Sequence, residues 1–205
     1  MTPATPTVAV RRGGRGLASA LALLMVVASA CRRSEPLPVL GILPEFNLTE
    51  RSGKTVGSDD LRGRIWIAGF IFTRCPDVCP LLTRRLAELQ APLADGRDPV
   101  QLVAFSVDPG HDTPEVLREY AERHGAGPHW WFLTGARDAI FAVLRDGFHV
   151  AIADNGPPSA PLTHSDRFAL VDRQMQIRGY YHGSDPQDLA RLQADARRLR
   201  DEPAA

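Results

Sequence analysis

The sequence predicts a mixed α/β domain with a central sheet and helices on both faces. Two nearly continuous apolar runs, residues 65–72 and 100–107, are typical of strands that are covered on both sides. Between them, residues 80–93 carry leucines at helical spacing. A strand–helix–strand unit of this kind forms a right-handed parallel crossover, so these segments are predicted to build the centre of the sheet.

The remaining elements follow in chain order. A second helix is predicted to end near His124, and Asp112 or Thr113 is suited to cap its first turn. Beyond it the pattern predicts a strand over 130–133, a helix over 136–145, a strand over 148–153, an antiparallel pair over 167–172 and 177–181, and a last helix over 186–200. Together these segments account for a single domain of the α/β class.

Composition limits the possible partners. The chain has 205 residues, of which 44% are hydrophobic and 23% charged, which is enough apolar content for one globular domain with an appendage. Lysine plus arginine and aspartate plus glutamate each number 24. No net charge draws the whole molecule to a polyanion, so no nucleic-acid partner is predicted.

The first 30 residues are predicted to be an export signal. Three arginines precede the apolar segment 17–30, which is too short to span a bilayer comfortably. The run Ala-Ser-Ala-Cys at 28–31 resembles the lipobox of bacterial lipoproteins, although Ala28 stands where lipoboxes usually carry leucine. We therefore predict lipidation of Cys31 and a membrane-anchored protein on the periplasmic side. Simple secretion and an uncleaved signal anchor stay open. Residues 31–44 are predicted to be a proline-rich tether and residues 45–205 the globular domain.

The stretch TRCPDVCP, residues 73–80, holds the other two of the chain's three cysteines. A proline follows each cysteine and disfavours helical backbone before it, so extended geometry is predicted at Cys75 and Cys79. Pro80 suits the first turn of the following helix. A helix N-terminus favours thiolate, which predicts a lowered pKa for Cys79. Such a pair can exchange electrons, hold a metal, or form a structural bridge. An exported compartment permits a Cys75–Cys79 disulfide.

The small ring between the cysteines argues against a purely structural bridge, because closing it removes little entropy from the unfolded chain. Asp77 lies between the two thiols and slightly favours a bound cation there. Thiolates suit copper(I), and a site that also accepts copper(II) requires imidazole. Among six histidines, His164 stands out because it directly precedes the strand predicted over 167–172.

Several segments together resemble the Sco/SenC family. They are residues 71–80 (IFTRCPDVCP), 106–115 (SVDPGHDTPE), 131–135 (WFLTG), and 162–165 (LTHS) before 168–172 (FALVD). The family has a thioredoxin-like fold and delivers copper to the binuclear copper site in subunit II of cytochrome c oxidase. The resemblance implies that Cys75, Cys79 and His164 bind one copper ion.

The resemblance also implies lesser roles and partners. Asp77 matches the acidic residue between the family's cysteines, and Asp112 matches the acidic residue of its aspartate–proline loop. The resemblance implies that these two residues support the metal ligands from outside or dock a partner. A helix N-cap is the alternative role of Asp112. A copper donor, a thiol reductant or both are implied as further partners. The rival function is a thiol–disulfide oxidoreductase that reduces the cysteines of the acceptor site.

Overall fold

The computed structural model describes residues 35–94, 98–153 and 163–202, and for residues 152, 153, 163 and 164 it describes the backbone only. The predicted export segment and Cys31 lie outside the described residues. Residues 37–205 form one compact unit. None of the helices in the described ranges is both long enough and apolar enough to cross a bilayer.

The core of the fold is a mixed sheet of eight strands, in the order β1-β10-β9-β4-β5-β6-β2-β3. The strands are β1 (Gly41–Ile42), β2 (Asn47–Glu50), β3 (Thr55–Gly57), β4 (Trp66–Ile71), β5 (Gln101–Ser106), β6 (Trp130–Thr134), β9 (Arg167–Val171) and β10 (Gln176–His182). β4, β5 and β6 are parallel, whereas the other neighbours pair antiparallel. Every residue of β4 and β5 is buried, as expected for strands covered on both faces.

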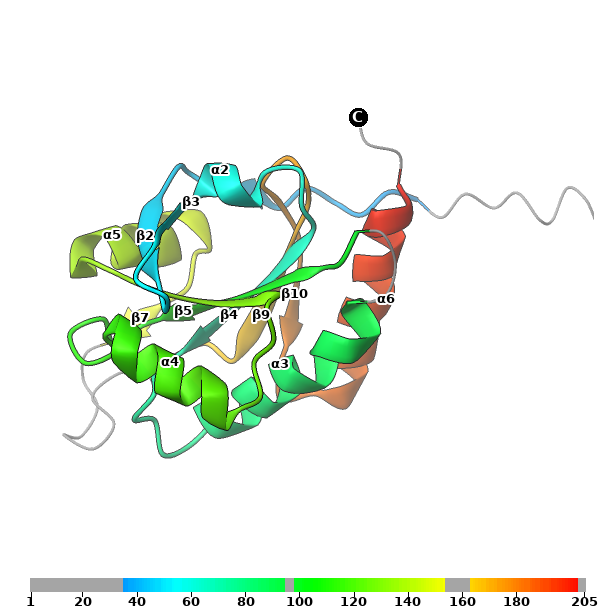
Figure 1. Ribbon diagram of the computed structural model, residues 1–205. Helices are drawn as coiled ribbons and strands as arrows, with labels where there is room; N and C mark the ends of the chain where they lie inside the picture. Colours follow the sequence, from blue (N-terminus) through cyan, green and yellow to red (C-terminus); the bar gives the residue numbers. More distant parts are fainter. Residues whose placement is uncertain (1–34, 95–97, 154–162, 203–205) are drawn as a thin grey trace, which may run out of the picture. The chain divides into compact units, whose positions relative to one another are not determined.

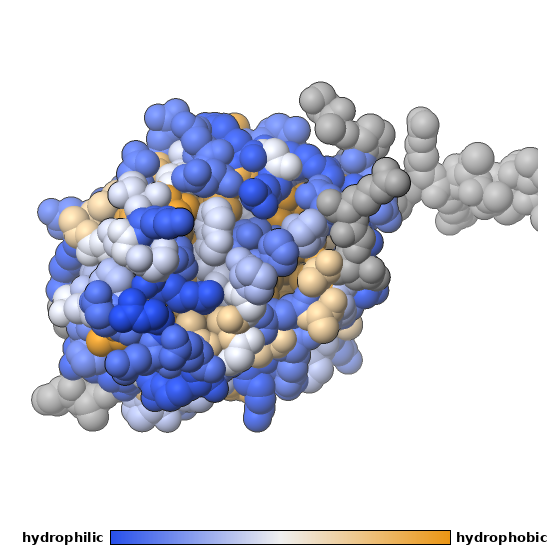
Figure 2. Space-filling model, viewed as in Figure 1, coloured by the Kyte–Doolittle hydropathy of each residue, from blue (hydrophilic) through white to orange (hydrophobic). Residues whose placement is uncertain are grey.

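Helices lie on both faces of this sheet (Figure 1). They are α2 (Ser58–Leu61), α3 (Cys79–Leu93), α4 (Pro114–Arg123), α5 (Arg137–Ala142) and α6 (Pro186–Asp201), and a π-helical turn, η1 (Val143–Gly147), continues α5. The view in Figure 2, from the same side, shows a mostly hydrophilic surface. This fits amphipathic helices that turn their apolar sides to the sheet.

Side-chain packing shows which elements cover each face of the sheet. A Cβ built on Gly69 of β4 would lie 2.7 Å from Leu86 Cδ1, so α3 sits directly against the backbone there. On the opposite face, Trp66 and Phe70 contact the ring of Phe148, which follows η1, with centroids 5.9 and 5.1 Å apart. The predicted mixed α/β class with helices on both faces is thus confirmed.

The N-terminal elements were not predicted. Strands β1, β2 and β3 and helix α2 are short, with two to four residues each. The strand predicted over 148–153 is wrong for its first four residues, since only Ile152 and Ala153 form a strand, β7. His149 has a positive φ of 53°, and Val150 N–H donates to the Leu144 carbonyl, so the chain turns back there.

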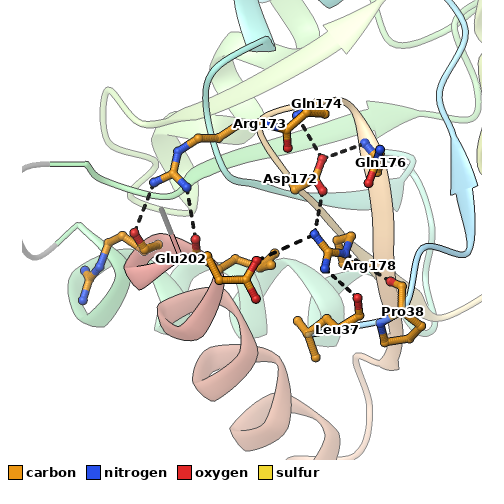
Figure 3. Close-up of polar contacts among 10 residues, drawn as sticks. Leu37, Pro38, Asp172, Arg173, Gln174, Gln176, Arg178 and Glu202 are labelled. Carbon is orange, nitrogen blue, oxygen red and sulfur yellow. Dashed lines mark hydrogen bonds and ion pairs between the residues drawn. The ribbon is translucent and has the colours of Figure 1, made fainter. Parts of the chain in front are cut away.

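Residues 37–44, which the sequence pattern assigned to the tether, contact the domain. Leu40 N–H donates to Ile177 O at 2.8 Å, and Leu43 N–H donates to Met175 O at 3.0 Å. The Arg178 guanidinium donates to the carbonyls of Leu37 and Pro38 at 2.5 and 3.1 Å (Figure 3).

The same guanidinium forms an ion pair with Asp172 at 2.8 Å and lies 3.9 Å from Glu202, just beyond α6 (Figure 3). Arg178 thereby joins the N-terminal segment, the β9–β10 turn and the end of the last helix. Its side chain is 10% exposed and that of Asp172 5%, so the pair is buried.

We expect Arg178→Ala to lower the free energy of unfolding by about 3–5 kcal/mol, because it leaves the buried Asp172 carboxylate without its cation. Chemical denaturation of the variant measures this loss. Arg197→Ala is the control, since Arg197 is an exposed arginine of α6, and we expect it to change stability by less than about 0.5 kcal/mol. Equal stability of the parent and Arg178→Ala would contradict the assigned role.

Candidate functional site

The predicted site residues belong to loops at one end of the sheet. Because β4 and β5 are parallel, their carboxyl ends meet, and the loops at 72–78 and 107–113 leave from the same edge. β9 runs antiparallel to β4, with Ala68 opposite Ala169 and Trp66 opposite Val171. The first residue of β9, Arg167, therefore also lies at the carboxyl end of β4.

The two cysteines lie together in the first of these loops. Neither thiol forms a disulfide within the described part of the chain; Cys79 is fully buried and Cys75 is 9% exposed. A side-chain hydrogen bond joins them, and Phe72 adds a backbone hydrogen bond to Cys79. Extended backbone at Cys79 was predicted wrongly, because Cys79 is the first residue of α3 and Pro80 the second. Proline is tolerated there because the N–H groups of a first helical turn have no intrahelical acceptor, so the helix can begin at the residue before Pro80.

The predicted lowering of the Cys79 pKa is also wrong. Burial raises the pKa of this thiol, and the neighbouring Cys75 raises it further. Removing a thiolate from water costs more free energy here than the helix N-terminus contributes by stabilising the negative charge. Cys79 is thus a protonated thiol in the metal-free protein, and a metal that binds it must displace a proton.

A buried carboxylate connects the cysteine loop to the loop after β5. Asp112 is fully buried and accepts hydrogen bonds from Thr73 Oγ1 at 2.5 Å, Thr73 N–H at 3.2 Å and Ser106 Oγ at 2.6 Å. Its alternative role as a helix cap is wrong, since Thr113 caps α4 by accepting from Val116 N–H. Asp112 therefore holds the start of the cysteine loop at Thr73, which is two residues before Cys75.

A second, more exposed contact joins the same two loops. Arg74 Nε donates to Asp108 at 2.6 Å, and Asp108 N–H in turn donates to Ser106 Oγ at 3.0 Å. Asp77 lies in the middle of the cysteine loop with its side chain exposed to solvent. Its position suits contact with a partner more than support of the loop.

Two residues beneath the cysteines were not predicted from the sequence. Thr83 of α3 and Tyr120 of α4 are buried and share a hydrogen bond of 2.7 Å between their hydroxyls. Burial raises the pKa of Tyr120 to about 12, and Cys79 and Cys75 are close enough to add to the increase. Helical spacing places both residues on the apolar faces of their helices, which indicates core packing but not proximity to the thiols.

His164 belongs to a short strand at the same edge. β8 (Thr163–His164) pairs antiparallel with β7 (Ile152–Ala153), and His164 is opposite Ile152. The His164 side chain lies outside the described part of the structure. Among the side chains that are described, no three His, Cys, Asp or Glu residues form a metal-binding group.

The turn between His164 and β9 is held by Asp166. Its carboxylate accepts from Ser184 Oγ at 2.6 Å and contacts His182 Nδ1 at 2.9 Å, while its carbonyl accepts from Gly183 N–H at 2.9 Å. These contacts fix the backbone between β8 and β9 to the end of β10. The predicted ligand His164 is thus two residues from a well-held turn.

Comparison with known proteins gives consistent matches over the domain. The SCO1/SenC family model matches residues 37–199. The SCO1 protein homolog of Bacillus subtilis (strain 168) is 28% identical over 170 residues, covering 82% of this chain and 88% of that protein.

Solved structures match equally broadly. A SCO1/SenC family lipoprotein from Bacillus anthracis str. Ames gives a TM-score of 0.73 at 31% identity, covering 82% of this chain and 99% of the other. Arabidopsis thaliana ScoI with copper bound gives 0.67 at 28% identity, covering 78% and 99%. BsSco, a Sco-family cytochrome c oxidase assembly protein with an identified disulfide switch, gives 0.67 at 28% identity, covering 79% and 98%.

Proposed function

Because the chain belongs to the SCO1/SenC family, we propose that it is a copper chaperone. Its metal-binding site comprises the thiolates of Cys75 and Cys79 and the imidazole of His164, which together hold one copper ion as Cu(I) or Cu(II). Soft sulfur ligands favour copper(I), and the imidazole supports copper(II).

The observation that carries this proposal is the paired thiols at the carboxyl end of β4. They are hydrogen-bonded to each other, so one small ion can replace their protons and bridge both sulfurs. Arg167, the third residue after His164, starts β9 at the same edge of the sheet. The copper-bound state of the Arabidopsis relative supports the choice of metal.

We assign delivery to the binuclear copper site of cytochrome c oxidase subunit II. A three-ligand site leaves a coordination position open, which a cysteine or histidine of the acceptor can enter before the donor ligands release the ion. Exposed Asp77 and the Arg74–Asp108 pair form the rim that such an acceptor would contact. The relative BsSco belongs to the Sco family of cytochrome c oxidase assembly proteins, and this supports cytochrome c oxidase as the acceptor.

Membrane attachment on the periplasmic side completes the proposed role. A lipid on Cys31 would hold the domain near a membrane-bound acceptor, and residues 31–36 would be the tether. The lipoprotein relative from Bacillus anthracis supports this form of attachment.

A second candidate function is thiol–disulfide exchange with the acceptor. The hydrogen bond between the two thiol side chains favours it, because neighbouring thiols can be oxidised together to a disulfide. Oxidation of Cys75 and Cys79 to a disulfide would pass two electrons and two protons to an acceptor disulfide, which becomes a dithiol. The disulfide switch of BsSco supports this chemistry.

His164→Ala separates the two functions. We expect the variant to lose the copper(II) form with its sulfur-to-copper charge-transfer absorption, because the site then lacks its imidazole. Its thiols should still reduce a disulfide substrate to the dithiol at the parent rate, as they become a disulfide themselves. His129→Ala is the control, since His129 is exposed at the amino end of β6, and it should keep the absorption band. A His164→Ala protein with an unchanged copper(II) spectrum would refute the three-ligand site.

A further inference from the structure

The first strand of the domain carries a concentrated apolar surface. In the part of the chain that the structure describes, the exposed large hydrophobic side chains are Val39, Leu40 and Ile42, at 55%, 50% and 67% exposure. Single exposed apolar residues are ordinary on a protein surface, but three within four positions form a contiguous apolar patch. They mark a surface that a partner is expected to cover.

These side chains are held on a rigid support. β1 is the edge strand of the sheet, with Gly41 opposite Ile177 and Ile42 opposite Gln176. β1 covers Gly41–Ile42, and Leu40 N–H donates to Ile177 O just before it, so residues 40–42 lie along β10 with Leu40 and Ile42 on one face. Arg178 fixes the segment just before it through the carbonyls of Leu37 and Pro38.

We propose that Val39, Leu40 and Ile42 insert into the surface of a lipid bilayer. The inference depends on the membrane attachment in the proposed function. Val39 follows the predicted lipidated residue Cys31 so closely that the intervening chain, even fully extended, spans at most about 28 Å. An apolar edge on so short a tether is the first part of the folded domain that can reach the bilayer, where its burial gains hydrophobic free energy.

This contact would set the direction in which the copper site points. β1 pairs with the start of β10, and β10 begins beside the end of β9, where Val171 is opposite Trp66 at the amino end of β4. The cysteine loop follows the carboxyl end of β4, six residues and about 20 Å further along the sheet. A bilayer against β1 would therefore leave the cysteine loop uncovered at the other end of the strands, open to an acceptor.

The test uses the full chain with Ile42→Trp, reconstituted in phospholipid vesicles with and without bromine on the acyl chains. The parent protein supplies the background emission of the native tryptophans. We expect the added indole to lose most of its emission in brominated vesicles. The matched control is Glu119→Trp, at an exposed position on α4, which packs on β6 far from β1 in the strand order, and its emission should not change.

The possible failures are distinguishable. Protein that sediments with the vesicles but shows equal emission at position 42 with both lipids overturns the lipid contact and leaves the attachment intact. Equal emission together with cross-linking between copies at β1 would assign the edge to a second copy of the chain. Protein that stays in the supernatant overturns the attachment and the lipid contact together, while the copper assays with His164→Ala are unaffected.

Discussion

Serine at position 79 is expected to abolish copper binding in both oxidation states. Cys79 is fully buried beside Cys75, so its replacement leaves Cys75 as the single thiol of the cysteine loop. A serine hydroxyl is a hard, protonated ligand that copper(I) disfavours. We expect the affinity to fall by more than about 100-fold, because loss of an outer-shell partner alone costs about 10–100-fold.

Competition against a copper(I) chelator measures this affinity, with the proteins in detergent. Cys31→Ser is the matched control, because it makes the same change at the cysteine outside the proposed site and should keep the parent affinity. Circular dichroism of both variants checks that they are folded. A Cys79→Ser protein that binds copper(I) within a few-fold of the parent would show that Cys79 is not a ligand.

Asp112→Ala is expected to lower the free energy of unfolding by about 2–5 kcal/mol. The fully buried carboxylate accepts from the Thr73 hydroxyl, the Thr73 N–H and the Ser106 hydroxyl. Without it, these donors stay buried with no acceptor, at about 1–3 kcal/mol for each unsatisfied group. Urea denaturation at neutral pH measures the loss. An unchanged midpoint would mean that the loop at 72–78 is held by other contacts.

The pH dependence of stability gives a second measurement at this residue. Burial raises the pKa of Asp112 above its ordinary value of 3.8. The stability that its protonation contributes is therefore complete below pH 3.8 and is lost as pH rises through the folded-state pKa. Relative to Asp112→Asn, which does not titrate, the parent should lose unfolding free energy across that window. A difference that grows with pH instead would contradict the raised pKa.

Glu115 offers a control of opposite sign in the same region. Hydrogen bonds from its own backbone and from Thr113 lower the pKa of Glu115. Its contribution is present above the unfolded-state pKa of about 4.3 and is lost as pH falls through the folded-state value. Relative to Glu115→Gln, the parent should therefore lose stability toward acid.

The centre of the fold was predictable because its signal is local. The apolar runs that form β4 and β5 and the leucine spacing of α3 are complete within single segments. β1 and β3 were missed because two or three residues carry no periodicity, and they become strands only by pairing with β10 and β2. The pairing of Gly41 with Ile177 joins distant parts of the chain, so it is a property of the folded protein.

The candidate site, too, was predictable only in part. Residue type and spacing identified Cys75 and Cys79 as candidates, and the family resemblance added Asp112. The structure places all three in adjoining loops at one edge of the sheet. The wrong pKa direction at Cys79 arose because helix position is visible in a sequence, whereas complete burial is decided by tertiary packing. The role of Asp112 likewise depends on Thr73, which is 39 residues away.

The hydrogen bonds from Arg178 to the carbonyls of Leu37 and Pro38 limit how far the chain can be shortened at its N-terminal side. A truncated protein that starts at residue 45 would lack β1 and both of these acceptors, and it would expose the edge of β10 at Ile177. An unpaired apolar edge strand invites aggregation. A soluble version of the domain should therefore begin at or before Leu37, where the compact unit itself begins.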